Sequence, residues 1–163
     1  MNHSSLFPEH DHDHDRCAAD ALHHAEKVCA RRGERLTPIR RQVLEALLTS
    51  HQPLGAYELI ESLGVEGKRP APITIYRALD FLREQGLVHR IESRNAFIAC
   101  LSEHAADATI AFFLCEQCGL VGEAALPGVA QSLARAAKSA GFSPKMSVVE
   151  MSGLCAHCAD KAK

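Results

Sequence analysis

The sequence predicts an α+β protein, in which an N-terminal winged helix-turn-helix is followed by a small α/β domain. Between residues 20 and 86, apolar side chains recur at the three- and four-residue spacing of amphipathic helices. After Gly86 the period changes, and two β-prone runs, 87–91 and 96–100, flank a Glu-Ser-Arg-Asn turn as in a hairpin. Helices followed by such a hairpin also occur in protein-interaction domains, so this fold alone does not establish DNA binding.

Composition and charge narrow the class of protein. A length of 163 residues with 47% hydrophobic side chains suits one or two small domains, each with a core. No apolar run approaches the roughly 20 residues of a membrane span, and the N-terminus lacks the apolar core of a signal peptide. We therefore expect a cytoplasmic protein with no membrane partner. Residues 31–94 hold eleven basic and eight acidic side chains, a balance of +3 where DNA phosphates would require it.

The first part of the chain divides into a tail and three helices. Residues 1–19 are predicted to be disordered, because the His-Asp repeat over 10–15 is of low complexity and cannot build a core. This tail could bind a metal weakly, although a solvated tail is the simpler interpretation. A first helix is expected over residues 20–32. The second begins at Thr37-Pro38, with a hydroxyl N-cap and a proline at the first position. After a turn over 51–55, a short third helix is expected over 56–63.

The helix expected over residues 73–86 is central to the prediction. Its apolar stripe has five members: Ile75, Ala78, Leu79, Phe81 and Leu82. Pro72 suits the first turn, and Gly86 can end the helix in a left-handed cap. Away from the stripe and toward the start lie Thr74, Tyr76 and Arg77, as in a recognition helix that presents side chains to a DNA groove. An ordinary surface helix shows the same pattern, so this stretch alone does not establish a recognition helix.

The winged helix is expected to span residues 20–101, and a polar connector over 102–109 separates it from a second domain over 110–163. In the second domain we expect three strands, over residues 110–114, 120–126 and 147–151. A helix is expected over residues 127–141, between the second and third strands. A helix on so small a sheet is only marginally stable alone. A structural metal and a dimer partner would both stabilise it.

Four of the seven cysteines form two C-x-x-C pairs, Cys115 with Cys118 and Cys155 with Cys158. In an intracellular chain this pattern indicates metal binding or redox chemistry before disulfides. Two residues between ligands let both sulfurs face one ion, and two such pairs complete the tetrahedron of a structural zinc site. The alternative is two free or redox-active pairs. A thioredoxin-like motif, however, would need a βαβ setting that the pattern does not show.

The chain resembles the Fur family of metal-sensing repressors, and within it the zinc uptake regulator (Zur) branch. The resemblance rests on the two C-x-x-C pairs and on three motifs: Leu36-Thr-Pro-Ile-Arg-Arg-Gln-Val-Leu, Thr74-Ile-Tyr-Arg-Ala-Leu-Asp-Phe-Leu and Gly86-Leu-Val-His-Arg-Ile-Glu-Ser. It implies that the second domain is an α/β dimerisation domain. It also implies a homodimer that binds an inverted-repeat, double-stranded DNA operator when loaded with metal.

The resemblance further implies a second, regulatory zinc, and hence two Zn²⁺ ions per chain. Three residues match the ligand positions of the family: His89, Cys100 and Glu123. A further histidine is expected where this chain has Ala108, and His104 and Asp107 are the nearby substitutes. We prefer His104, because imidazole suits zinc, and a thiolate ligand favours zinc over ferrous iron or manganese.

The expected function is that of a zinc-responsive transcriptional repressor of zinc-uptake genes, with no enzymatic activity and no small-molecule substrate. On DNA, Tyr76 would pack on a thymine methyl group and Arg77 would reach a guanine edge or a phosphate. Arg40, Arg41 and Lys68 are candidates for phosphate contacts. The alternatives are a family member that senses iron, manganese or peroxide, a zinc storage or delivery protein that does not bind DNA, and a thiol oxidoreductase.

Overall fold

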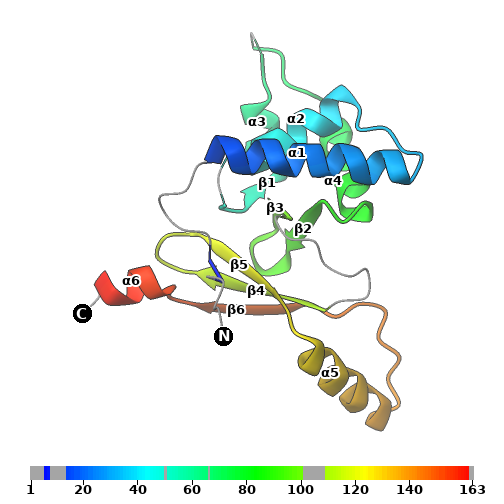
Figure 1. Cartoon of the computed structure of the whole chain (residues 1–163), viewed down its shortest axis with the longest axis vertical. Coiled ribbons are helices and arrows are strands. Elements are labelled where there is room, and N and C mark those ends of the chain that lie inside the picture. Colours follow the sequence, from blue (N-terminus) through cyan, green and yellow to red (C-terminus); the bar gives the residue numbers. More distant parts are fainter. Residues whose placement is uncertain (1–5, 8–13, 50, 66, 101–108, 162–163) are drawn as a thin grey trace. The chain divides into compact units, whose positions relative to one another are not determined.

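The computed structural model of the chain describes residues 6–7, 14–49, 51–65, 67–100 and 109–161. It forms two compact units (Figure 1). The described part of the first runs from helix α1 to strand β3, and that of the second comprises residues 6–7 together with the chain from residue 109 onward. Of the expected connector over 102–109, only Thr109 is described. No helix in the described ranges is long and apolar enough to cross a membrane.

The first unit is a winged helix-turn-helix. Its elements are, in order, α1 (His14–Arg31), α2 (Pro38–Leu48), β1 (Leu54–Gly55), α3 (Ala56–Ser62), α4 (Pro72–Glu84), β2 (Val88–Ile91), the 3-10 turn η1 (Glu92–Arg94) and β3 (Ala96–Ala99). The three strands form an antiparallel sheet in the order β1-β3-β2. Strands β2 and β3 pair from Val88 with Ala99 to Ile91 with Ala96, which makes the predicted wing.

Helix α4 packs as its sequence pattern predicts. Ile75, Leu79 and Leu82 are completely buried in the core of the unit. The helix ends in the predicted left-handed cap, because Gly86 has a φ of +73° and the N–H of Leu87 donates to the carbonyl of Leu82 at 2.9 Å. The apolar stripe therefore fixes which face of α4 turns inward and leaves Thr74, Tyr76 and Arg77 off it.

Three predictions for this unit need correction. Helix α1 begins at His14 rather than at residue 20, so the expected disorder over 1–19 is wrong for residues 14–19. Ala18 packs against the core, and tertiary contacts of this kind outweigh a polar composition. The segment expected as a turn holds β1, which pairs with β3. Thr37 does precede α2, but within the described residues its hydroxyl makes no cap hydrogen bond.

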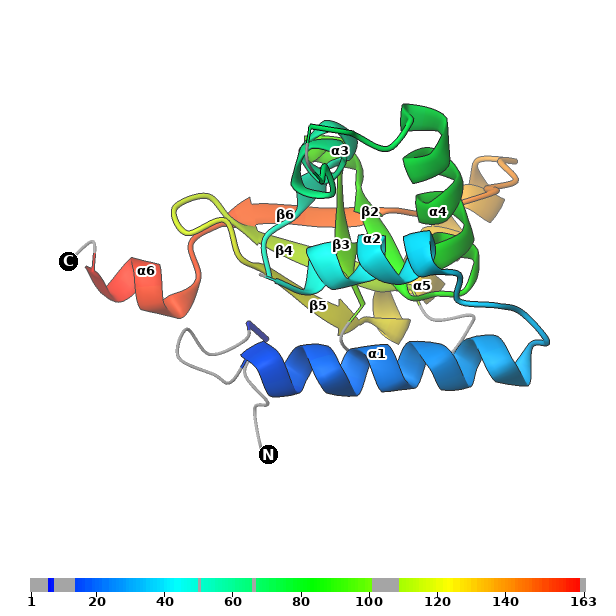
Figure 2. The same cartoon turned by 90° about the horizontal axis from the view of Figure 1, so that it is seen from above.

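The second unit is a small α/β sheet structure. Its elements are β4 (Ile110–Cys115), β5 (Val121–Ala125), α5 (Pro127–Ser139), β6 (Val149–Gly153) and α6 (Ala156–Lys161). Strand β4 lies in the middle, antiparallel to β5 and parallel to β6. Parallel pairing requires a crossover, which contains α5. Figures 1 and 2 show α5 and α6 at opposite ends of this sheet.

The C-terminal helix α6 follows the last element that the sequence predicts and was not among the expected elements. Its Cys158 is only 3% exposed and belongs to a small buried cluster with Cys115 and Cys155. The burial of Cys158 in this cluster stabilises a helix that is otherwise short and polar. With both units in place, the predicted fold class, a winged helix-turn-helix followed by a small α/β domain, is confirmed.

Candidate metal centre and nucleic-acid interface

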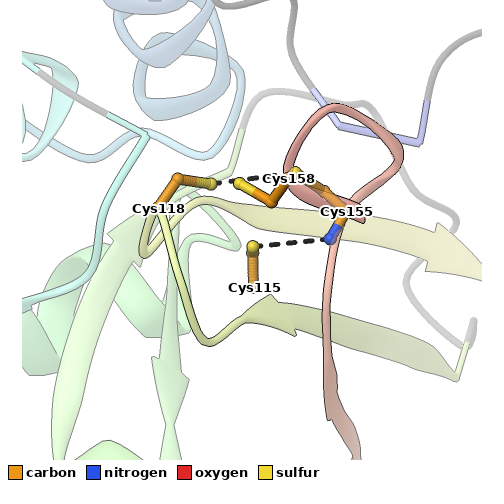
Figure 3. A group of neighbouring side chains, drawn as sticks. All are labelled: Cys115, Cys118, Cys155 and Cys158. Atoms are coloured by element: carbon orange, nitrogen blue, oxygen red, sulfur yellow. Dashed lines mark hydrogen bonds between the residues drawn. The ribbon is translucent and has the colours of Figure 1, made fainter. Parts of the chain in front are cut away.

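The two C-x-x-C pairs meet at one end of the second sheet. Cys115 is the last residue of β4, and Cys118 lies in the turn that follows. Parallel pairing of β4 with β6 places Cys115 opposite Gly153, so that Cys155 and Cys158 follow directly at the start of α6. Figure 3 shows the four side chains gathered from these two segments. Their sulfur atoms all lie within 4.8 Å of one another.

The sulfur spacing fits a metal site and does not fit a disulfide. The Sγ atoms of Cys118 and Cys155 are 3.8 Å apart, and none of the four described cysteines is in a disulfide. A disulfide would bring two sulfurs to about 2.05 Å. A tetrahedral zinc ion with Zn–S bonds of about 2.3 Å separates its sulfurs by about 3.8 Å. The cluster therefore has the size that a closed zinc tetrahedron needs.

The thiols of this cluster differ in acidity. Burial alone would raise the pKa of Cys115, but backbone N–H groups of Cys118, Cys155 and Gln117 donate to its sulfur and lower the pKa to about 6. The hydrogen bond from the N–H of Cys155 is 3.4 Å long. Burial and the neighbouring thiols raise the pKa of Cys158 to about 12. One thiolate therefore forms readily, and its negative charge disfavours the ionisation of the neighbouring thiols. A bound dication would offset this repulsion.

A second pair of potential ligands lies on the wing. His89 of β2 pairs with Ile98 of β3, and Cys100 is two residues beyond Ile98, so both ligands lie on the same face of the hairpin. Their ligand atoms lie within 4.8 Å of each other, and the N–H of Cys100 donates to the carbonyl of Leu87 at 2.9 Å. Glu123 is half-buried on β5, opposite Phe112.

His104 lies outside the described residues, as does its alternative Asp107. Of the predicted regulatory ligands, the structure brings together the pair on the wing, His89 and Cys100.

The start of helix α4 offers side chains to a partner. Tyr76 is 42% exposed, Arg77 is exposed, and Thr74 is half-buried in the first turn. No hydrogen bond or ion pair to another described side chain engages Arg77, whereas Arg83 further along the helix lies 3.6 Å from the carboxylate of Asp80. Arg77 is thus available for an external acceptor.

Two of the predicted phosphate contacts are already engaged within the first unit. The guanidinium of Arg40 lies over the ring of Phe81, 3.4 Å from its centre. Arg41 forms ion pairs with Glu26 of α1 and, at 2.9 Å, with Glu45 of α2, and these hydrogen bonds raise its pKa. Their contacts favour a structural role over phosphate binding.

Lys68 is exposed, in a tight turn closed by its own backbone pairing with Val65. It therefore stays a candidate for a phosphate contact.

One further candidate was not identified from the sequence. Tyr57, the second residue of α3, is 76% exposed. It does not belong to the buried face of the helix, which is formed by Ala56, Leu59 and Ile60. An aromatic residue off the apolar face could have been recognised in the sequence as a candidate for contact with a partner.

Fold and site together define a class of protein, namely a winged-helix protein that carries a candidate thiolate metal centre. The model of the ferric uptake regulator family matches residues 31–152. The chain belongs to the ferric uptake regulator family.

Relatives of the chain include regulators of two kinds. It is 40% identical over 141 residues to the zinc uptake regulation protein of Escherichia coli, covering 86% of this chain and 82% of that protein. It is 31% identical over 151 residues to the peroxide operon regulator of Bacillus subtilis, covering 88% of this chain and 97% of the other. A solved zinc uptake regulator complexed with zinc and DNA matches with a TM-score of 0.80 and 38% identity, over 89% of this chain and 97% of that one.

Proposed function

We propose that this chain is a zinc-responsive transcriptional repressor, which binds an inverted-repeat DNA operator as a zinc-loaded homodimer and controls zinc-uptake genes in the cytoplasm. The observation that carries the proposal is the likeness of fold and sequence to a zinc uptake regulator solved with zinc and DNA. The family's members are regulators, which argues against an enzyme. It also argues against the storage and oxidoreductase alternatives.

Two zinc ions per chain fit the donor groups. The first is held by Cys115, Cys118, Cys155 and Cys158, whose spacing, burial and N–H···S bonds suit a structural zinc. The second is held by the wing pair, His89 and Cys100, together with Glu123 and His104. The support for the second ion is the geometry of the wing pair and the family resemblance, and its thiolate favours zinc over iron or manganese.

Operator reading is assigned to the exposed start of α4. Tyr76 contacts a thymine methyl group, Arg77 contacts a guanine edge or a phosphate, and Thr74 lies beside them. Tyr57 and Lys68 are exposed near the helix-turn-helix and are assigned to phosphates. Arg40 and Arg41 are left with the structural role that their contacts indicate.

The function is tested by following metal content and duplex binding together. The duplex is an inverted repeat selected from random DNA by the zinc-loaded protein. We expect one zinc per chain that resists mild chelation and a second that leaves together with DNA affinity. Duplex binding that survives the loss of the second zinc would contradict the regulatory role. A protein that never retains a selected duplex would be a storage protein instead.

Replacing Cys100 by serine should uncouple zinc from DNA. The variant loses the thiolate of the wing pair and should bind one zinc instead of two, with duplex affinity that no longer rises on zinc addition. Metal analysis and a zinc titration of duplex binding measure both effects. The control is Cys17→Ser, since Cys17 is a half-buried cysteine of α1 outside both candidate metal clusters. A Cys100→Ser protein with normal zinc-dependent binding would remove Cys100 from the site.

A homodimer is supported by an apolar surface on the second unit, here called the α5–β6 surface. Its large exposed apolar side chains are Leu133, Phe142, Met146, Val148, Met151 and Leu154. No side chain of α5 is buried within the chain, although the helix carries apolar residues along its length. We propose that a partner subunit covers these exposed apolar side chains of α5, β6 and the segments beside them.

Placing a charge on the α5–β6 surface should separate the dimer. In Met151→Glu the new carboxylate would lose water in the interface without a partner, which should weaken dimerisation by about 100-fold or more. Sedimentation at micromolar concentration measures the change. Val65→Glu is the control, because Val65 is 70% exposed on a loop of the first unit. Equal masses for Met151→Glu and the wild type would place the dimer contact elsewhere.

The second candidate function is a peroxide sensor, which the relationship to the peroxide operon regulator favours. Such a protein would release its duplex after oxidation at constant metal supply. A zinc sensor releases it on zinc removal under reducing conditions. Measuring duplex retention under these two conditions separates the two functions.

A further inference from the structure

The described N-terminal residues, Leu6 and Phe7, belong to the second unit rather than to the winged helix that follows them in sequence. Phe7 is half-buried and packs against the cluster of Cys115, Cys155 and Cys158. An aromatic ring thus covers part of the thiol centre. None of the sequence motifs indicates this contact, since the ligands lie more than a hundred residues away along the chain.

Gly122 provides the space in which this segment rests. It lies buried on β5, opposite Phe113, with no left-handed backbone angle that would require glycine. A Cβ atom at this position would meet the carbonyl oxygen of Leu6 at 2.5 Å and its Cγ at 3.0 Å. Real Cβ atoms do not approach other atoms so closely, so the missing side chain is what admits the backbone of Leu6.

We propose that Leu6 and Phe7 form an apolar cover over the thiol centre, which slows both metal release and the access of reagents to the sulfurs. The proposal deepens, and rests on, the assignment of a zinc ion to the four cysteines. An apolar shell around a metal site controls solvent access and strengthens the electrostatic bonds within it. Exposed thiolates, in contrast, are the ones that exchange and oxidise.

The direct test is the rate at which the zinc-loaded dimer transfers its thiol-bound zinc to a chromogenic chelator. Phe7→Ala should release zinc about tenfold faster, the lower end of the effects seen when groups around metal ligands are changed. Phe7→Leu keeps an apolar side chain and should stay close to the wild-type rate. Circular dichroism of each variant confirms that the second unit is folded.

A second variant displaces the cover without changing the residues that form it. Gly122→Ala should displace Leu6 and release zinc faster, while Gly128→Ala should not, because nothing lies within 4 Å of a Cβ at residue 128. The double variant Phe7→Ala with Gly122→Ala should be no faster than Phe7→Ala alone. Residues that act through one element show this non-additivity.

The outcomes test the cover separately from the assignment of zinc to the four cysteines. Wild-type and Phe7→Ala proteins that hold zinc equally and release it at one rate would overturn the cover. Additive effects of Phe7→Ala and Gly122→Ala would overturn the role of Gly122 in seating it. A wild-type chain without zinc would contradict the zinc assignment. The rate of thiol modification by a charged disulfide reagent, still expected to rise in Phe7→Ala, would then decide on the cover.

Discussion

Replacing Cys115 by serine is expected to remove the tightly bound zinc and to unfold the second unit. Cys115 is completely buried, and the backbone N–H groups that donate to its sulfur lower its pKa to about 6, so it supplies a thiolate readily. Serine does not deprotonate at neutral pH, which leaves three ligands and an unpaired hydroxyl. The loss of zinc affinity should exceed the roughly 100-fold that follows from disturbing a group behind a ligand.

Metal analysis after mild chelation and thermal unfolding followed by circular dichroism measure this effect. We expect no retained zinc and no cooperative transition for the second unit, because the binding free energy of a structural zinc is part of the folding free energy. Cys17→Ser serves as the matched control, as its thiol lies in α1 of the first unit and belongs to neither candidate metal cluster. If Cys115→Ser kept one zinc after chelation, the four cysteines would not form the structural site.

Replacing Arg77 by alanine is expected to weaken operator binding by about 10- to 100-fold, since a bidentate contact to guanine contributes about 1–3 kcal/mol. Zinc content and dimer mass should stay unchanged, because Arg77 is a member of neither candidate metal cluster. Its exposed guanidinium has no partner among the described side chains, so the variant loses no internal interaction. Fluorescence anisotropy with the selected duplex, at fixed salt, measures the affinity.

A control for the loss of one positive charge is Arg135→Ala on α5 of the second unit, where the guanidinium, among the described residues, has one hydrogen bond, of 3.4 Å, to Ser132. Both variants lower the net charge equally. Only Arg77→Ala should also reduce the preference for the selected duplex over random DNA. An unchanged affinity for Arg77→Ala would remove α4 from its role in reading the operator.

Local patterns account for the elements that were predicted correctly. Helix α4 carries its own evidence, with a stripe of buried side chains, Pro72 at the start and Gly86 at the end. The wing follows from two β-prone runs of matching length. The four clustered cysteines follow from their spacing, because a C-x-x-C pair can hold one ion whatever the rest of the fold does.

Contacts between distant residues account for what the sequence did not show. The ion pair between Arg41 and Glu26 joins two helices and withdraws a basic side chain from the phosphate candidates. Strand β1 has only two residues and exists because β3 offers it a partner. Helix α6 and the packing of Phe7 both depend on the thiol cluster, which brings them together from opposite ends of the chain.

The parallel pairing of β4 with β6 has a consequence for how this unit folds. Cys118 and Cys155 are separated by 37 residues, and an ion held between them closes a loop that contains α5 and β6. Closing a loop of this length removes chain entropy worth about 4 kcal/mol from the unfolded state. Unlike a disulfide, this cross-link forms in a reducing environment and can be withdrawn. Folding of the α5–β6 surface, and with it the supply of assembly-competent subunits, would then depend on metal supply during synthesis.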